Sequence, residues 1–245
     1  MDFQHRLIYL ILALPAFVAA FTLHEFAHAY VADHLGDSTA RRAGKLTIDP
    51  FKQLDPIGSL VLVVTILLNL PPIGWASVPV QKRNFRNPNR DHALVCVAGP
   101  LSNVAQAFVW LALLYAVRFA AGAAHVTYSI EDVLGIINRQ PDITSPWVGI
   151  AAMCAIGVTL NLSLAVFNML PIPPFDGGFI MESLVPALQP LYDAIRPFSF
   201  MIILLLATGG SGALRAAFDP VDHFADGLVL GGMGHQGKDF YYDTK

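Results

Sequence analysis

Charged side chains are scarce in this sequence. Lys, Arg, Asp and Glu make up 13% of its 245 residues, whereas they make up roughly 25% of a typical soluble domain. Hydrophobic residues account for 55%, and they are gathered in long runs separated by short polar stretches. This pattern excludes an ordinary soluble domain and is typical of a membrane protein with several spanning segments.

Cysteine is nearly absent, and other common features are missing. The two cysteines, Cys96 and Cys154, lie in apolar runs without a CxxC partner, which excludes a disulfide framework and a thiolate metal site. The sequence contains no internal repeat, no second soluble domain and nothing that resembles a nucleic-acid-binding surface. The first apolar run continues without a small-x-small cleavage site, so we expect no cleaved signal peptide.

The apolar runs predict an all-α polytopic membrane protein. A bilayer core of ~30 Å requires roughly 20 helical residues, and three runs meet this requirement: residues 7–33, 92–121 and 147–170. A further span is expected at about 197–214. We expect one integral membrane domain over residues 1–218, followed by a polar, glycine-rich tail at 219–245.

A shorter apolar run, residues 57–73, lies between two basic segments. Lys and Arg occur at positions 41, 42, 45 and 52 before it and at positions 82, 83, 86 and 90 after it. Because basic residues favour the cytoplasmic side, both segments are expected there, and the run would enter the membrane and return on the same side. The alternative is a short true span. The residues before this run, 41–55, are expected to be extended rather than helical.

The first long run contains the sequence FTLHEFAHAY at residues 21–30, which includes an H-E-x-x-H pattern. His24 and His28 are four positions apart and therefore share a helix face, where both can bind one metal ion. Glu25 lies about 100° around the helix from His24, which favours a role as a base beside the metal rather than as a ligand. Catalytic zinc takes three protein ligands, so a third must come from elsewhere.

The best candidate for the third ligand is Asp176, in the stretch NMLPIPPFDGG at residues 168–178. Three prolines and two glycines there break the preceding helix where the apolar run ends. With alternating spans, HEFAH, AGPLSN (residues 98–103) and this stretch are expected at the same depth of the bundle. The bland alternative for Asp176 is a turn residue at a helix end, and for the histidines a buried polar pair.

These motifs together resemble the site-2 proteases, which are intramembrane zinc metalloproteases, and in particular their compact bacterial branch without PDZ or CBS domains. The resemblance covers roughly residues 21–182 and includes HEFAH, DPIGSL, GWASVPVQKRNFRNPNRD, AGPLSN and NMLPIPPFDGG. It implies one Zn²⁺ bound by His24, His28 and Asp176, with Glu25 as the catalytic acid and base. It also implies that Asn168 positions the substrate or the transition state.

The resemblance further implies a three-helix catalytic core, with a re-entrant segment and a small membrane-associated β-sheet between its first two helices. The implied activity is hydrolysis of peptide bonds in or near transmembrane segments of other membrane proteins. The implied location is a bacterial inner membrane, with the active site towards the cytoplasm. A substrate helix would unwind and add to an edge of the sheet by β-augmentation. On the middle core helix, Gly99, Pro100 and Asn103 match a packing motif.

Two other classes of function remain open at this point. A catalytically silent homologue would bind and escort membrane helices, although such proteins usually lack the glutamate or a ligand. A metal transporter would use intramembrane His and Asp along an ion path, which favours polar residues at several depths rather than in one layer. A departure from the family pattern occurs at Phe175, where a leucine is usual, and another at Ser77-Val78, but neither removes a ligand.

Overall fold

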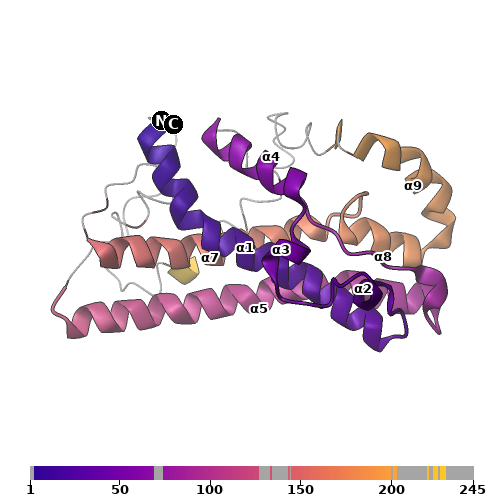
Figure 1. The fold of residues 1–245 in the computed structure, drawn as a ribbon, viewed down its shortest axis with the longest axis horizontal. Helices are drawn as coiled ribbons and strands as arrows, with labels where there is room; N and C mark the ends of the chain where they lie inside the picture. The colour runs from indigo at the N-terminus through magenta and orange to yellow at the C-terminus, as the bar shows by residue number, and fades with distance from the viewer. Residues whose placement is uncertain are drawn as a thin grey trace.

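The computed structural model describes residues 3–68, 74–126, 133, 143, 145–199, 201–202, 220, 223–225 and 227–229. Among these residues, three helices are long and apolar enough to cross a membrane: α1 (Phe3–His34), α5 (Pro88–Ala123) and α7 (Pro146–Asn168). Their bounds lie close to those of the three predicted core spans. The structure therefore fits the predicted polytopic membrane protein (Figure 1).

The remaining elements are short and connect or extend the three long helices. α2, α3 and α4 follow α1, and α8 and α9 follow α7 (Figure 1). In chain order they are α2 (Thr39–Arg42), α3 (Pro50–Gln53), α4 (Pro56–Leu67), the 3₁₀ turn η1 (Lys82–Asn84), α8 (Asp176–Leu184), η2 (Pro186–Leu188), α9 (Gln189–Ile195) and η3 (Arg196–Phe198).

The predicted β-sheet is wrong for the part of the chain that the structure describes. That part contains one isolated antiparallel bridge, between Leu54 and Ala76, and no strand. The backbone carbonyls of Lys45 and Thr47, which a strand would pair with a neighbour, instead accept hydrogen bonds from the side chain of Gln53. The sheet edge that was expected to receive a substrate is therefore not present among these residues.

The prediction of extended chain at residues 41–55 is wrong in part, because Asp-Pro pairs start helices there. Asp49 precedes α3, and its side chain accepts a hydrogen bond from the amide of Phe51. Asp55 precedes α4 and accepts from the amide of Gly58 in the same way. In both cases a proline occupies the first helical position, where its fixed φ is favourable. This capping outweighs the β-branched and polar composition of the segment.

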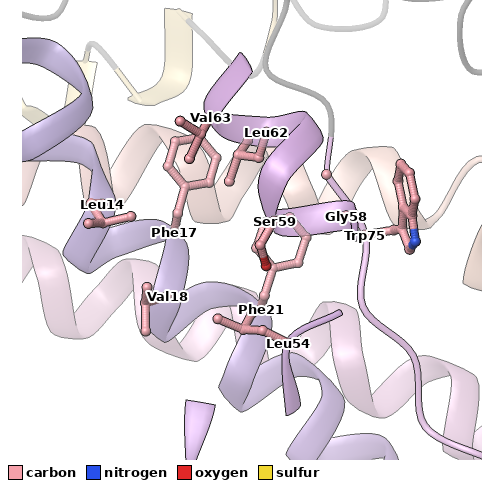
Figure 2. Close-up of a pocket in the computed structure, with 11 residues that line it drawn as sticks. Leu14, Phe17, Val18, Phe21, Leu54, Gly58, Ser59, Leu62, Val63 and Trp75 are labelled. Carbon is pink, nitrogen blue, oxygen red and sulfur yellow. The ribbon is translucent and has the colours of Figure 1, made fainter. Parts of the chain in front are cut away.

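Helix α4 packs against α1 but is too short to cross a membrane as a straight helix. Its 12 residues span about 18 Å, compared with the ~30 Å of a bilayer core. Leu62 and Ile66 of α4 pack against Ala13 and Phe17 of α1, and Figure 2 shows a neighbouring groove that Trp75 also lines. The end of the predicted re-entrant run, residues 69–73, lies outside the described residues, as does most of the further span expected at 197–214.

The long helices pack closely because α7 presents small side chains to its neighbours. Ala151, Ala152 and Ala155 have no exposed surface, and they belong to a hydrophobic core that also contains Leu114 of α5. Small residues allow the backbones of membrane helices to approach one another. α5 contacts both α1 and α7, and it also contacts α8, so side chains from all four helices can meet beside it.

Candidate metal centre

Helix α1 supplies two buried imidazoles. His24 and His28 are one helical turn apart, and each is only 7% exposed. Their Nε2 atoms are 3.0 Å apart, which places both nitrogens at one point on the face of α1 that packs against α5. This is the arrangement that the i, i+4 spacing of the H-E-x-x-H pattern predicts.

The imidazoles fit there because α5 has no side chain at Gly99. A Cβ atom at this position would lie 2.4 Å from Nε2 of His28 and 2.6 Å from Cε1 of His24. Real Cβ atoms do not approach other atoms so closely, so any larger residue would displace at least one ring. The two rings therefore pack directly against the backbone of α5 at Gly99.

Asp176 reaches the same point from the first turn of α8. The chain turns through a proline-rich segment after α7 ends at Asn168, and α8 then starts against the backbone of that turn. A Cβ atom at Gly177 would lie 2.3 Å from the carbonyl oxygen of Met169, and one at Gly178 would lie 2.6 Å from the carbonyl carbon of Ile172. The two glycines thus permit the close approach that holds Asp176 in place.

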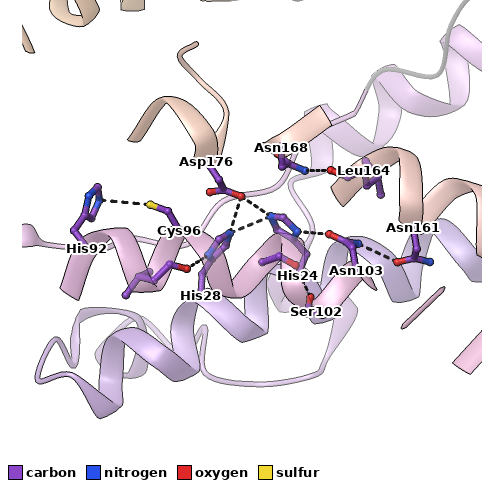
Figure 3. Close-up of polar contacts among 12 residues, drawn as sticks. His24, His28, His92, Cys96, Ser102, Asn103, Asn161, Leu164, Asn168 and Asp176 are labelled. Carbon is purple, nitrogen blue, oxygen red and sulfur yellow. Dashed lines mark hydrogen bonds and ion pairs between the residues drawn. The ribbon is translucent and has the colours of Figure 1, made fainter. Parts of the chain in front are cut away.

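The carboxylate of Asp176 lies beside both imidazoles. Its Oδ2 atom is 3.2 Å from Nε2 of His24 and 3.4 Å from Nε2 of His28 (Figure 3). Among the described residues, these three side chains form the group that could hold a metal ion. The structure therefore brings together the three residues that the sequence proposes as ligands, from α1 and α8.

The geometry of these three atoms fits a zinc ion. Zinc bonds of about 2.0–2.1 Å in a tetrahedron place neighbouring ligand atoms roughly 3.3 Å apart. The three observed separations are 3.0, 3.2 and 3.4 Å. Oδ2 of Asp176 is also buried without a hydrogen-bond donor among the described residues, which is costly for a carboxylate oxygen unless a cation binds it.

Each histidine also makes a hydrogen bond through its other ring nitrogen. Nδ1 of His28 lies 2.7 Å from the carbonyl oxygen of Val95, which can only accept, so Nδ1 carries the hydrogen. Nδ1 of His24 lies 2.5 Å from Oδ1 of Asn103. Such partners fix the ring orientation of a metal-binding histidine and leave Nε2 for the metal.

The two predicted catalytic residues lie near the cluster but outside its ligand set. Glu25 is buried on α1 beside His24, and among the described residues it does not belong to the group of ligand atoms. Asn168 is half-buried at the last position of α7, where its Nδ2 donates a hydrogen bond to the carbonyl oxygen of Leu164. The catalytic roles of both residues stay predictions.

Sequence reasoning missed Asn161, which is fully buried and hydrogen-bonded to Asn103. A signal existed: Asn161 lies in an apolar run, seven residues before Asn168, so a helix places both on nearly the same face. The Val95 carbonyl could not have been found, because a backbone acceptor leaves no trace in the sequence.

The chain is similar to a family of peptidases and to several proteins named as zinc metalloproteases. Residues 12–209 match the model of a family described as "Peptidase family M50". The chain is 36% identical over 200 residues to "Putative zinc metalloprotease YwhC" of Bacillus subtilis, across 81% of this chain and 79% of the relative. It is 30% identical over 197 residues to "Putative zinc metalloprotease Rip2" of Mycolicibacterium smegmatis, across 80% of this chain and 66% of the relative.

Another relative is less similar. The chain is 28% identical over 172 residues to "Putative zinc metalloprotease MJ0611" of Methanocaldococcus jannaschii, across 70% of each protein. No solved structure matches the chain significantly.

Proposed function

This chain belongs to peptidase family M50 and is a zinc metalloprotease of the site-2 type, and from that premise we propose that it cleaves peptide bonds in or near the transmembrane segments of other membrane proteins. The observation that carries the proposal is the meeting of His24, His28 and Asp176 within a bundle of apolar helices. A metal-ligand cluster at that place gives a hydrolytic site to substrates that lie in the bilayer.

We assign the zinc to Nε2 of His24, Nε2 of His28 and a carboxylate oxygen of Asp176. When bound, zinc polarises a carbonyl group and lowers the pKa of a bound water to ~7. Glu25 would accept a proton from the attacking water and deliver it to the leaving amine, a role typically worth ~10²–10⁴ in rate. This role is supported by the position of Glu25, which is buried on α1 next to the ligand His24 and about 100° around the helix from it.

Asn168 is proposed to position the substrate. It precedes the proline-rich turn that leads to Asp176, so its amide lies at the same end of α7 as the metal ligands (Figure 3). Its Nδ2 bonds to its own helix, which orients the side chain. An amide held in this way can offer a hydrogen bond to an extended peptide backbone at small entropic cost.

The bilayer environment is supported by the outer surfaces of the three long helices. Large apolar side chains are exposed along them, as is expected where lipid replaces water. They include Leu7, Ile11 and Leu14 on α1, Leu101, Phe108, Val109 and Phe119 on α5, and Ile150 on α7.

We propose an orientation with the active site towards the cytoplasm of a bacterial cell, in the inner membrane. His24 and His28 lie in the part of α1 that leads to the basic residues of α2. Basic residues also follow α4, so both ends of that segment carry the charge that favours the cytoplasmic side. In this arrangement α4 belongs to a re-entrant segment, residues 1–218 form the protease domain, and residues 219–245 form a tail.

The test is the substitution Glu25→Gln, which keeps the size of the side chain and removes its basicity. Quantitative proteomics of membrane-protein fragments should find fragments in cells with the wild-type chain that are absent with the variant. Zinc content of the purified variant should equal that of the wild type. Asp193→Asn, a change in an exposed carboxylate, serves as the control and should leave the fragments unchanged. Identical fragments in wild-type and Glu25→Gln cells would contradict the proposal.

A further inference from the structure

Two asparagines lie beside the proposed zinc ligands but do not belong to the ligand group. Asn103 lies on α5 and Asn161 lies on α7, and both are 0% exposed. Burying a side-chain amide costs free energy unless its donors and acceptors form hydrogen bonds, so both asparagines are expected to have partners inside the protein.

The two side chains form a continuous series of hydrogen bonds that ends at a zinc ligand. Nδ2 of Asn161 lies 2.9 Å from the carbonyl oxygen of Gly157, and Nδ2 of Asn103 lies 2.9 Å from Oδ1 of Asn161. Oδ1 of Asn103 then lies 2.5 Å from Nδ1 of His24 (Figure 3). We refer to Asn103 and Asn161 with these three bonds as the asparagine network.

The direction of the network is set at its far end. The Gly157 carbonyl can only accept, so Asn161 must turn its NH₂ group towards it and its oxygen towards Asn103. Asn103 must then turn its NH₂ group towards that oxygen, which leaves its own oxygen facing His24. Nδ1 of His24 must therefore carry the hydrogen. This reasoning does not depend on which amide atom was assigned as oxygen, because only one orientation satisfies every bond.

We propose that Asn103 and Asn161 are positioning residues that fix the tautomer and ring orientation of His24, Asn161 acting from α7 without touching the metal ligands. This inference rests on the zinc ligation assigned above. With hydrogen on Nδ1, the lone pair of His24 is on Nε2, where it faces Nε2 of His28 and Oδ2 of Asp176. A hydrogen bond to Nδ1 also makes Nε2 a better ligand.

The network also links the helices that carry the ligands. His24 is on α1, whereas α7 leads through the proline-rich turn to Asp176 on α8. A bond from α7 through Asn103 to His24 therefore ties the first ligand to the helix that delivers the third. His28 needs no such network, because its Nδ1 donates to the backbone carbonyl of Val95.

A buried amide nearby provides a matched control. Gln106 lies on α5, three residues after Asn103, and is 7% exposed, but neither its Nε2 nor its Oε1 has a hydrogen-bond partner among the described residues. If Asn103 and Asn161 merely filled space, replacing Gln106 by leucine would disturb the site as much as replacing Asn161 by leucine.

The experiment measures zinc affinity and the tautomer of His24 in the purified full-length chain in detergent. Competition with a chromophoric chelator should show zinc binding about 10–100-fold weaker in Asn161→Leu and Asn103→Leu, because the loss of a ligand's hydrogen-bond partner typically has this effect. Gln106→Leu should bind zinc within twofold of the wild type.

Nitrogen NMR of metal-free protein with ¹⁵N-labelled histidine reports the tautomer of His24, which would not change if the asparagines served only for packing. His24 should carry hydrogen on Nδ1 in the wild type and in Gln106→Leu, and a mixture of tautomers should appear in Asn161→Leu. If Asn161→Leu is not recovered as folded protein, Asn161→Ser gives the same comparison with a side chain too short to reach Asn103.

Two results would overturn the inference. Wild-type zinc affinity and an unchanged tautomer in Asn161→Leu, or an equal loss in Gln106→Leu, would assign these asparagines to packing while leaving the proposed protease intact. Unchanged zinc binding in His24→Ala would instead reject the ligation itself, and the network with it.

Discussion

Two carboxylates in this molecule, Asp37 and Asp176, have opposite surroundings. Asp37, after the end of α1, is fully buried, and its oxygens accept hydrogen bonds from the amide and hydroxyl of Thr39, the amide of Gln81 and the side chain of Asn84. Oδ2 of Asp176 has no hydrogen-bond donor among the described residues and instead faces two imidazole nitrogens. Hydrogen bonds from the protein thus satisfy the oxygens of Asp37, whereas Oδ2 of Asp176 remains available to bind a cation.

This difference indicates that Asp37 has a structural role and Asp176 a role in binding metal. The Asp37 side chain joins the loop after α1 to the segment that precedes α5, so it fixes the connection around α2 to α4. Asp176 contributes little to holding α8, because the glycine contacts with the preceding turn already do so. We therefore expect Asp37 to be needed for folding stability and Asp176 for zinc.

The largest effect is expected from Asp176→Ala. Zinc binding should weaken by at least about 100-fold and cleavage should become undetectable, because one of three ligands is lost. The thermal stability of the metal-free protein should not fall, since the substitution removes a buried charge that lacks a donor. Metal analysis and thermal unfolding of metal-free protein check both parts. A metal-free variant that unfolds well below the wild type would show that Asp176 is structural after all.

Gly99→Ala should have the next largest effect. The added methyl group would lie 2.4 Å from Nε2 of His28, and both rings are held by hydrogen bonds through Nδ1, so they cannot move aside cheaply. We expect zinc affinity to fall about 10-fold or more, as when ligand positioning is disturbed. Gly122→Ala on the same helix is the matched control and should bind zinc normally, because outside the neighbouring backbone of α5 no atom of the described residues lies within 4 Å of the new Cβ.

Asp37→Ala should reverse the pattern of Asp176→Ala. Zinc affinity should stay within twofold of the wild type, while the free energy of unfolding should fall by about 2–4 kcal/mol, because four hydrogen bonds to a buried, charged acceptor are lost. Unfolding in detergent, followed by circular dichroism, measures the loss. Equal stability of the variant and the wild type would remove the proposed distinction between the two carboxylates.

The smallest effect is expected in the pH dependence of folding stability, measured in Asp37→Asn. Burial acts to raise the pKa of Asp37, but hydrogen bonds from Gln81, Thr39 and Asn84 outweigh it and lower the pKa below its usual value. A lowered folded-state pKa contributes stability that is present above the unfolded pKa of about 3.9 and is lost as pH falls through the folded value. The stability of Asp37→Asn should therefore depend less on pH below about 4 than that of the wild type. Parallel pH profiles would contradict this assignment.

The sequence was sufficient for features that depend on local chemistry. The three long helices follow from apolar length, the His24–His28 pair from helical spacing, and the position of Asp176 from the proline-rich break before it. Tertiary contacts decided the rest. The expected sheet failed because Asp49 and Asp55 cap short helices, and because Gln53 satisfies carbonyls that a strand would otherwise pair.

Asn161 and Asp37 escaped the sequence reasoning for a related reason. An asparagine in an apolar run, or an aspartate after a helix, acquires its role only from residues far away in the chain, here Asn103 for one and Gln81 and Asn84 for the other. The spacing of Asn161 and Asn168 marks a shared helix face but does not identify Asn103 as a partner, and the residues around Asp37 do not point to Gln81 or Asn84.

The most direct test of the central claim is X-ray absorption at the zinc edge of the purified full-length protein. The account predicts two imidazole nitrogens at about 2.0–2.1 Å, oxygen donors at about 2.0–2.2 Å and no sulfur, with a changed spectrum in Asp176→Asn. A sulfur neighbour at about 2.3 Å, or a spectrum that Asp176→Asn leaves unchanged, would contradict ligation by His24, His28 and Asp176.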